Sequence, residues 1–456
     1  MTASIVCKFG GTSVADAAAI RRSAAIVAGR AHQQPIVVVS ALAGVTNALL
    51  ALAAQAAAGQ LIPALAAVQQ LRQRHLDEVD ALLATSPDHG DVAAEVSVMF
   101  DELATLCGAL SVLGFITPRS LDAIASVGEQ VSSLLCAHAF RAVGMDAVHV
   151  DARKVVVTDD HFGAATPQPD EIAIAARDHV LPVLHAGHIP VMGGFIGATA
   201  GGITTTLGRG GSDYSASLVG AAVRSDVIEI WTDVDGMLTA DPRVVPVART
   251  VEHVRFDEAS ELASFGAKVL HPATIAPAVR LGIPVRVLNS RNPGGKGTLI
   301  TSDAPRRAVT AIAAKRDTTI VRVTTGSMLF QVGFLGRVFA LFEQHGVSVD
   351  VVATSEVSLS VTIDEDGPLD ALVAALRQVG DVTVERRRGI VSVVGSGLAD
   401  DGVAMGRILR ALGRRRVHML SLSASGINLT VLVDDREVPD AMRALHAEFF
   451  EGQEAA

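Results

Sequence analysis

Short apolar segments alternate with segments of helical spacing along residues 1 to about 300. The apolar segments span residues 4–9, 35–40, 147–150, 189–192, 227–231 and 284–288. Residues 14–30, which follow the first of them, repeat their apolar positions at helical spacing. Near-continuous apolar strands between helices are typical of a mostly parallel sheet covered on both faces. The pattern therefore predicts an α/β fold whose ligands bind in the loops after the strands' carboxyl ends.

The pattern changes beyond residue 300. A glycine-rich stretch at residues 293–297 and a polar stretch at residues 301–307 indicate a domain boundary. Beyond it, residues 336–364 and 406–434 resemble each other without a gap, at an offset of 70 residues. Each copy has the pattern of an amphipathic helix, a turn and two short strands rich in β-branched residues. This repeat predicts two small α+β modules packed on each other.

Composition and charge exclude several classes of protein. The 456 residues allow about three domains, and 49% hydrophobic against 19% charged residues excludes intrinsic disorder. The net charge of −10 argues against a nucleic acid or an anionic membrane as the main partner. The N-terminus lacks a basic segment followed by a long apolar one, and the alanine-rich residues 48–58 are too short to span a bilayer. We expect neither a signal peptide nor a membrane anchor.

The three cysteines, Cys7, Cys107 and Cys136, are far apart in the sequence. Their spacing fits neither a metal site nor a disulfide framework. We therefore expect three buried free thiols in a reducing cytoplasm.

The first loop with recognisable chemistry begins where Lys8 precedes Gly10 and Gly11, before a helix. Glycine N–H groups can lie close to an anion, and a lysine at a strand end can neutralise charge during phosphoryl transfer. A tight strand–helix turn with a solvated lysine explains this short motif equally well. Neither this loop nor the glycine-rich residues 294–298 has the GK[ST] sequence of a Walker A motif.

A second glycine-rich loop spans residues 199–213 and contains Arg209 and Asp213. Dense glycine with hydroxyl groups before a helix is typical of an anion-binding loop. Arg209 can hold a carboxylate or a phosphate with two hydrogen bonds. A merely flexible loop is the alternative.

Acidic and hydroxyl side chains follow the strand predicted at residues 227–231. Thr232 and Asp233 suit a ribose or a metal-bound nucleotide, whereas the following Asp-Gly pair also fits a simple turn. Lys268 comes after a predicted helix, and Glu129 stands at a turn or helix start. Taken alone, Glu129 is also explained as a partner of the helix dipole.

Seven motifs, in order, resemble those of aspartate kinases. They are KFGGTSVA at residues 8–15, SALAGVTN at 40–47, SVGEQVS at 126–132, TTTLGRGGSDYSA at 204–216, WTDVDG at 231–236, TADPR at 239–243 and FGAKVLHP at 265–272. The C-terminal repeat resembles the tandem ACT domains of the same enzymes. The resemblance covers nearly the whole chain and is closest to the monofunctional, lysine-sensitive type.

This resemblance implies a three-layer amino-acid-kinase sandwich with a mostly parallel sheet over residues 1–300. Two ferredoxin-like ACT modules would follow, the first over residues 308–390 and the second over residues 391–439. In the family the second ACT unit is inserted within the first. We therefore expect residues 440–456, with a strand near residues 445–451, to complete the first module.

The resemblance also implies the reaction of ATP with L-aspartate to give ADP and 4-phospho-L-aspartate, the first step towards lysine, threonine and methionine. Mg²⁺ would bridge the phosphates of ATP, and the sequence firmly assigns no protein ligand to it. By match to the motifs, Lys8 with the Gly10 and Gly11 amides would neutralise phosphoryl charge. Arg209 would hold the α-carboxylate of the substrate and Glu129 its α-ammonium group.

The remaining site residues follow from the same motifs. Ser40, Thr46 and Asp213 would orient the substrate. Thr232, Asp233, Arg243 and Lys268 would hold the nucleotide. One departure is Leu238, at a position where relatives often carry a tyrosine near the nucleotide.

Feedback inhibition by L-lysine is the expected regulation. The implied effector residues are Met328, Gly333, Phe334, Leu335, Asp350, Thr354, Ser355 and Glu356. Across the repeat, Leu420 replaces Asp350 and Gly426 replaces Glu356, so only the first copy carries acids for a cationic amino acid. Threonine is the competing effector, and an exposed strand-end acid is the structural alternative for Asp350. We expect a cytoplasmic homodimer formed through the ACT modules, or a tetramer.

Two other functions fit the same pattern. One is a kinase of this fold class that uses a different carboxylate or a phosphate-like acceptor, although Glu129 with Arg209 favours an α-amino acid. The other is a non-catalytic amino-acid sensor. The joint presence of Lys8, Glu129, Arg209 and Asp213 argues against a sensor.

Overall fold

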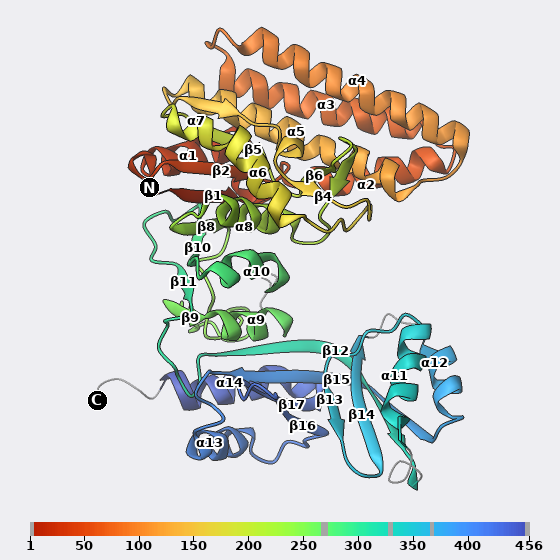
Figure 1. Ribbon diagram of the computed structural model, residues 1–456. Helices are drawn as coiled ribbons and strands as arrows, with labels where there is room; N and C mark the ends of the chain where they lie inside the picture. Colours follow the sequence, from red (N-terminus) through yellow and green to blue (C-terminus); the bar gives the residue numbers. More distant parts are fainter. Residues whose placement is uncertain (1–3, 266–271, 327–331, 365–368, 452–456) are drawn as a thin grey trace. The chain divides into compact units, whose positions relative to one another are not determined.

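The computed structural model describes residues 4–265, 272–326, 332–364 and 369–451 (Figure 1). The chain divides into two compact units. The first comprises Met1–Met237 and Leu270–Ser302, and the second comprises Leu238–Val269 and Asp303–Ala456. The first unit thus ends near the boundary expected at residue 300, whereas residues 238–269 group with the second unit.

The first unit is built on a mixed sheet with the strand order β3-β5-β2-β1-β8-β10-β11. Its strands are β1 (Ile5–Phe9), β2 (Pro35–Val39), β3 (Ala147–His149), β5 (Ile189–Gly193), β8 (Val227–Thr232), β10 (Val285–Asn289) and β11 (Thr298–Thr301). All neighbours pair in parallel except β10 and β11. The six apolar segments of the sequence are the six parallel strands. A small sheet consists of β4 (Val157–Thr158), β6 (Ile196–Thr199) and β7 (Thr204–Thr206).

Helices cover both faces of this sheet (Figure 1). They are α1 (Ala17–Ala28), α2 (Val45–Ala57), α3 (Leu61–Leu83), α4 (His89–Leu113), α5 (Pro118–Ala142), α6 (Pro169–His179), α7 (Leu181–His185), α8 (Gly211–Val223) and α10 (Pro272–Leu281). Helix α5 contacts β2, β3 and β5 on one face, and α8 contacts β1, β2 and β8 on the other. The predicted three-layer α/β architecture is therefore confirmed.

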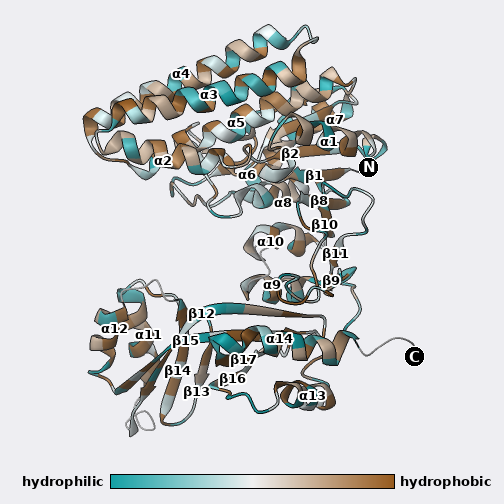
Figure 2. Cartoon of the chain, turned by 180° about the vertical axis from the view of Figure 1, so that it is seen from behind, coloured by the Kyte–Doolittle hydropathy of each residue, from teal (hydrophilic) through white to brown (hydrophobic). Residues whose placement is uncertain are grey.

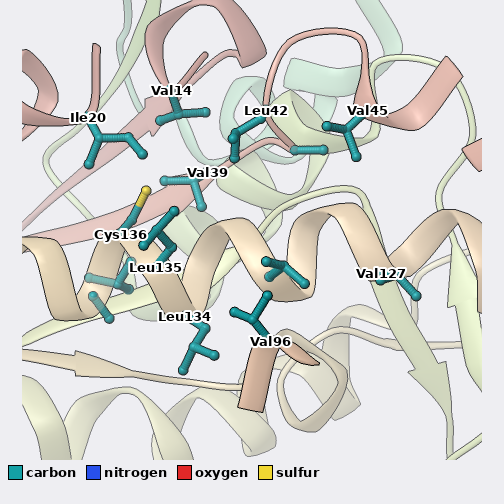
Figure 3. Packing of buried hydrophobic residues seen from close by; sticks show 14 of the residues in the cluster. Val14, Ile20, Val39, Leu42, Val45, Val96, Val127, Leu134, Leu135 and Cys136 are labelled. Carbon is teal, nitrogen blue, oxygen red and sulfur yellow. The ribbon is translucent and has the colours of Figure 1, made fainter. Parts of the chain in front are cut away.

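An extensive hydrophobic cluster lies on the α5 side of the sheet. Leu134, Leu135 and Cys136 of α5 pack there with Val39 of β2 and Val96 of α4 (Figure 3). Cys7, Cys107 and Cys136 are free and buried, as the sequence predicted. All three belong to the hydrophobic cluster, and Sγ of Cys7 also donates to Oε2 of Glu229 at 3.8 Å.

Among the described helices, α4 is long and apolar enough, by length and composition alone, to cross a membrane. Its buried residues include Val92, Val96, Phe100, Leu103 and Cys107, which belong to the same hydrophobic cluster. Hydrophilic and hydrophobic residues alternate along α3 and α4 (Figure 2). Packing within the fold accounts for the apolar residues of this buried stripe.

Local sequence determines where α5 begins and how closely it packs. Thr117 and Ser120 form a capping box at its start, and Pro118 occupies the first turn. Within the helix, a Cβ atom at Gly128 would lie 2.8 Å from Cβ of Ala41. Only glycine therefore lets α5 approach the loop after β2, and the next residue, Glu129, is held against that loop.

The second unit contains a six-stranded antiparallel sheet with the order β13-β14-β12-β15-β17-β16. Its strands are β12 (Ala311–Thr324), β13 (Val352–Thr354), β14 (Ser358–Asp364), β15 (Asp381–Val394), β16 (Met419–Leu422) and β17 (Asn428–Asp434). The unit also contains β9 (His253–Arg255), α9 (Phe256–Ser264), α11 (Phe334–Gln344), α12 (Leu369–Leu376), α13 (Gly402–Leu412) and α14 (Val438–His446).

The 70-residue repeat is visible in this sheet. Strands β12 and β15 begin 70 residues apart, and so do β14 and β17. Asp317 and Arg387, also 70 residues apart, both have φ of 54°. These are unusual left-handed conformations for residues other than glycine. The predicted pair of α+β modules is confirmed.

The strand expected near residues 445–451 is wrong. Helix α14 runs to His446, and residues 447–451 continue as a π-helix. The reason is visible in the sequence, because Val438, Ala441, Met442 and Leu445 are buried at helical spacing.

The segment also completes the other module. Ala441 and Leu445 of α14 share a hydrophobic cluster with Ile408 of α13, Val431 of β17 and Ile312 at the start of β12. The cluster of the first module contains only residues between 321 and 384. Strand β12 crosses from one module to the other at a register shift after Lys315. The start of β12 and α14, which are distant in the sequence, therefore complete the second module and not the first.

Candidate active site

A cavity of about 720 Å³ opens in the first unit, beside the carboxyl ends of β1 and β2. Its walls come from the loop after β2, one side of α5, and the loop between β7 and α8. The predicted site residues in its lining are Lys8, Gly11, Ser40, Thr46, Glu129, Arg209 and Asp213. The structure thus brings together, in one cavity, residues that are widely separated in the sequence.

Lys8 and Asp213, which both line this cavity, form an ion pair. The Nζ atom of Lys8 lies 2.6 Å from Oδ1 of Asp213, and their side chains are 9% and 16% exposed. Lys8 is held by the buried strand β1, and Asp213 lies in the first turn of α8. The N-terminus of α8, which also lines the cavity, favours negative charge. The site therefore combines a fixed cation with a helix end suited to an anion.

The Gly10 amide, predicted to bind phosphate, makes a hydrogen bond within the fold. The N–H group of Gly10 donates to the carbonyl of Trp231 at 3.0 Å, so it is already used to join β1 and β8. Gly11 does line the cavity, and a Cβ atom there would lie 3.0 Å from the carbonyl oxygen of Ala41. Gly11 is thus the glycine of this motif at which a side chain would crowd the neighbouring loop.

Glu129 is a buried carboxyl group in the middle of α5, not at the turn or helix start that the sequence suggested, and it makes no ion pair with the cations that the structure describes. It is 3% exposed, and its Oε2 atom has no hydrogen-bond partner among the described residues. Burial raises the pKa of Glu129 to about 8, although the N–H group of Ala41 acts in the opposite direction. A buried carboxylate is costly unless a cation accompanies it. Glu129 is therefore suited to a ligand that brings its own positive charge.

Arg209 offers the complementary charge. It is exposed at the cavity and makes no ion pair among the residues that the structure describes. Gly208 and Gly210 on either side of it have φ of 73° and 74°, which glycine adopts without strain. A cavity with a buried carboxyl group and an available guanidinium matches the two charges of an α-amino acid.

The backbone at Ser40 is fixed on both sides. Its N–H group donates to the carbonyl of Phe9 at 3.0 Å, and its carbonyl accepts from Oγ of Ser132 at 2.7 Å. Thr46 lies in the first turn of α2. Both hydroxyl-bearing residues therefore stand on well-anchored backbone at the cavity wall.

Asp122 lines the cavity and was missed by the sequence analysis. It is 2% exposed and accepts hydrogen bonds from the N–H and Oγ1 of Thr206 at 3.0 and 2.7 Å, and from the N–H of Gly163 at 2.9 Å. It thereby fixes the start of the loop that carries Arg209. The sequence could have indicated Asp122, because it lies seven residues, about two helical turns, before Glu129 and therefore on the same side of α5.

Phe195 was also missed, and no feature of the sequence indicated it. It lines the cavity with φ of 64°, a left-handed conformation that is unusual for an aromatic residue. Its carbonyl accepts from the N–H group of Leu207 at 2.9 Å. This bond joins it to the loop before α8.

Of the four residues predicted to bind the nucleotide, the structure describes Thr232, Asp233 and Arg243. The carbonyl of Thr232, at the end of β8, accepts from the N–H and Oγ of Ser290 at 2.9 and 3.1 Å. Oγ1 of Thr232 donates to Asp233 at 3.3 Å. Arg243 lies in the second unit, where it is paired with Asp241 at 2.7 Å. Lys268 lies outside the described residues.

The predicted effector residues lie in the first module of the second unit. Gly333, with φ of 79°, precedes the buried Phe334 and the partly exposed Leu335 at the start of α11. Asp350 precedes β13, and Thr354 ends it. Ser355 and Glu356 follow in the turn before β14. Met328 lies outside the described residues.

Within the described ranges, no group of three or more His, Cys, Asp or Glu side chains could hold a metal ion.

Family models match both parts of the chain. A model of the amino acid kinase family matches residues 3–289, and a model of the ACT domain matches residues 391–449. The lysine-sensitive aspartokinase 3 of Escherichia coli (strain K12) is 36% identical over 460 residues, which cover 99% of this chain and 100% of that protein. The chloroplastic aspartokinase 3 of Arabidopsis thaliana is 36% identical over 98% of this chain and 81% of its own length.

Solved structures show the same similarity. Aspartokinase III of E. coli in complex with aspartate and ADP aligns with a TM-score of 0.84 at 36% identity, over 98% of this chain and 100% of that one. The same enzyme in complex with lysine and aspartate aligns with a TM-score of 0.82, over 98% of this chain and 99% of that one. The chain belongs to the amino acid kinase family and, within it, to the aspartokinases that carry C-terminal ACT domains.

Proposed function

We propose that this kinase transfers the γ-phosphoryl group of ATP to the β-carboxylate of L-aspartate, giving ADP and 4-phospho-L-aspartate. The observation that carries the proposal is the buried Glu129, whose Oε2 atom has no partner among the described residues, in one cavity with Arg209 and the Lys8–Asp213 pair. A relative with the same fold binds aspartate and ADP. The reaction would be the first step of lysine, threonine and methionine biosynthesis, in the cytoplasm.

The charges of the cavity suggest how the substrate binds. Glu129 would accept the α-ammonium group and Arg209 the α-carboxylate, while Ser40, Thr46 and Asp213 orient the molecule. The β-carboxylate is already anionic, so attack on the γ-phosphorus needs no strong base. Catalysis then consists of alignment and of neutralising charge on the transferred group, the role we give to Lys8.

The nucleotide contacts are proposed from the motifs. Thr232, Asp233, Arg243 and Lys268 would hold ATP. Mg²⁺ usually binds through substrate phosphates and one or two carboxylates, and Asp213 is a carboxylate of the cavity lining that fits this donor set. The ion would neutralise charge on the phosphates.

A comparison of acceptors tests this proposal. We expect ADP release with L-aspartate and little with succinate, which has both carboxylates but no ammonium group for Glu129. L-Glutamate, which places its side-chain carboxylate one carbon further away, serves as the length control. Equal rates with succinate and L-aspartate would contradict the role of Glu129.

The rate should depend on pH in a defined direction. Glu129 is protonated in the free enzyme below its pKa of about 8, whereas binding of an ammonium group requires the carboxylate. We therefore expect kcat/KM for L-aspartate to rise with pH, about tenfold per unit below pH 8, and to level off above it. Glu129→Gln should lower kcat/KM and remove this dependence. A flat wild-type profile between pH 6 and 8 would contradict the prediction.

We further propose feedback inhibition by L-lysine, bound at the first ACT module with Asp350 as a partner of one of its ammonium groups. The E. coli relative is named lysine-sensitive, and its structure has been solved with lysine. Allosteric coupling typically amounts to about 1–3 kcal/mol, enough for clear inhibition if lysine prefers the inactive state.

Asp350→Ala should abolish inhibition by lysine, because a cationic amino acid loses its carboxylate partner. The measurement is the rate at increasing lysine, relative to the rate of the same variant without lysine. Asp370→Ala removes an exposed carboxylate of α12 in the same module and should leave inhibition unaltered. Inhibition of Asp350→Ala at wild-type potency would place the effector elsewhere.

A homodimer formed through the ACT modules, or a tetramer built from it, is the proposed assembly. Strands β13 and β16 lie at the two ends of the six-stranded sheet. Val352 of β13 and Leu420 and Leu422 of β16 are exposed there. β13 and β16 also contact each other within the chain. Exposed apolar side chains on such edge strands are suited to contacts between copies.

A further inference from the structure

The carboxylate predicted to bind the effector already holds a lysine of the chain itself. The Nζ atom of Lys315 lies 2.7 Å from Oδ2 of Asp350 and 2.5 Å from Oδ1 of Asp364. The side chains of Lys315 and Asp350 are about a quarter exposed, and that of Asp364 is mostly exposed. One ammonium group is therefore shared between two carboxylates.

Lys315 reaches these acids from the strand that links the two modules. It pairs with Ile390 of β15, immediately before the register shift. Asp350 and Asp364 precede β13 and end β14, in the first module. Figure 2 shows hydrophilic residues along this part of β12. The lysine thus extends from a strand segment of one module to the acids of the other.

The arrangement occurs only once in the described part of the repeat. The residues 70 positions after Lys315, Asp350 and Asp364 are Glu385, Leu420 and Asp434. Glu385 and Asp434 contact arginine and histidine side chains instead. Within the described repeat, an ammonium group shared by two acids therefore occurs only at the acids of the module that carries the predicted effector residues.

We propose that the Lys315 side chain is a tethered competitor of free L-lysine for Asp350. The proposal rests on the lysine inhibition proposed above and concerns its sensitivity. An incoming ammonium group must displace the one that Asp350 already holds. The apparent affinity for lysine is then reduced by the fraction of molecules in which Asp350 is occupied.

Asp364 lowers the free energy needed to displace Lys315 from Asp350. When Asp350 binds free lysine, the Lys315 ammonium group still has the Asp364 carboxylate as a partner. Burial alone would lower the pKa of Lys315, but its hydrogen bonds to Asp350 and Asp364 raise it above its ordinary value. The Lys315 side chain is therefore fully charged at neutral pH and competes with free lysine as a cation.

Two substitutions are expected to change lysine sensitivity in opposite directions. Lys315→Met removes the competitor, so the lysine concentration for half-inhibition should fall about two- to fivefold, the range for a partly exposed ion pair. Asp364→Asn removes the second partner, so Lys315 binds Asp350 more firmly and the half-inhibition concentration should rise. Lys315→Arg keeps the charge and should resemble the wild type.

Arg316→Met is the matched control. It removes the same charge one residue away, and Arg316 pairs with Asp435 rather than with Asp350. This variant should keep wild-type sensitivity. Calorimetric titration of the full-length protein with L-lysine, without substrates, should give the same order of affinities and does not depend on turnover.

The outcomes separate this inference from the proposed regulation. A wild-type enzyme that lysine does not inhibit overturns both. A wild-type enzyme that lysine inhibits, with Lys315→Met unchanged or less sensitive, overturns the competitor role alone. If Lys315→Met does not fold, an unchanged or lowered half-inhibition concentration in Asp364→Asn overturns it equally.

Discussion

Lys8→Met is expected to lower kcat with ATP and L-aspartate by ~10²–10³-fold, a typical cost for removing a group that stabilises transition-state charge. Lys8 is 9% exposed in its side chain, held by a central strand, and is the cation paired with Asp213 in the cavity. Its charge is needed most while the phosphoryl group is transferred, so ATP binding should change far less than turnover.

The measurement is steady-state kinetics together with the dissociation constant of ATP. Lys154→Met is a suitable control because it removes an exposed lysine of the same unit that does not line the cavity. A Lys8→Met enzyme that keeps more than about half of the wild-type turnover would show that Lys8 has another role.

Arg209→Ala should instead raise the KM for L-aspartate. A hydrogen bond to a charged group contributes about 1.5–3 kcal/mol, so the increase should be roughly 10- to 100-fold. The guanidinium is exposed at the cavity, and a substrate carboxylate is its expected partner. The fall in kcat should be much smaller than the rise in KM, since this contact exists before and during phosphoryl transfer.

Arg177→Ala, at an exposed position of α6, is the control for loss of a surface arginine. An unchanged KM for L-aspartate with a large loss of kcat would assign Arg209 to the phosphoryl group and not to the substrate α-carboxylate.

The strands of the first unit could be predicted because parallel strands covered on both faces are apolar almost throughout. Residues 35–40 and 227–231 show this pattern, and the structure places them as β2 and β8. Residues such as Glu129 and Arg209 could be predicted because the site is built from short motifs with unusual composition. A zwitterionic ligand requires both a negative and a positive side chain, and Glu129 and Arg209 supply one of each.

Other features depend on contacts that no local pattern reveals. The N–H group of Gly10 donates to the carbonyl of Trp231, which is distant in the sequence, so this contact of the first glycine loop is a tertiary effect. In the sequence, the role of Asp122 cannot be told from that of any other helical acid, because its partners Thr206 and Gly163 are distant along the chain.

The module boundary was wrong for a similar reason. The sequence shows two copies, but it does not show that β12 runs through both of them. Residues 311–315 of β12 pair with the second half of β15, and α14 packs in the same module. The register shift after Lys315, where one module gives way to the other, is a property of strand pairing.

Trapping of the product with hydroxylamine tests the central claim most directly. With Mg-ATP and L-aspartate, the enzyme should form an acyl phosphate that hydroxylamine converts to aspartyl hydroxamate, in step with ADP release. The β-hydroxamate is the expected isomer because the α-carboxylate is bound by Arg209. Hydroxamate no greater than in a sample without enzyme, at every pH from about 7 to 9, would contradict the assignment of aspartate kinase activity.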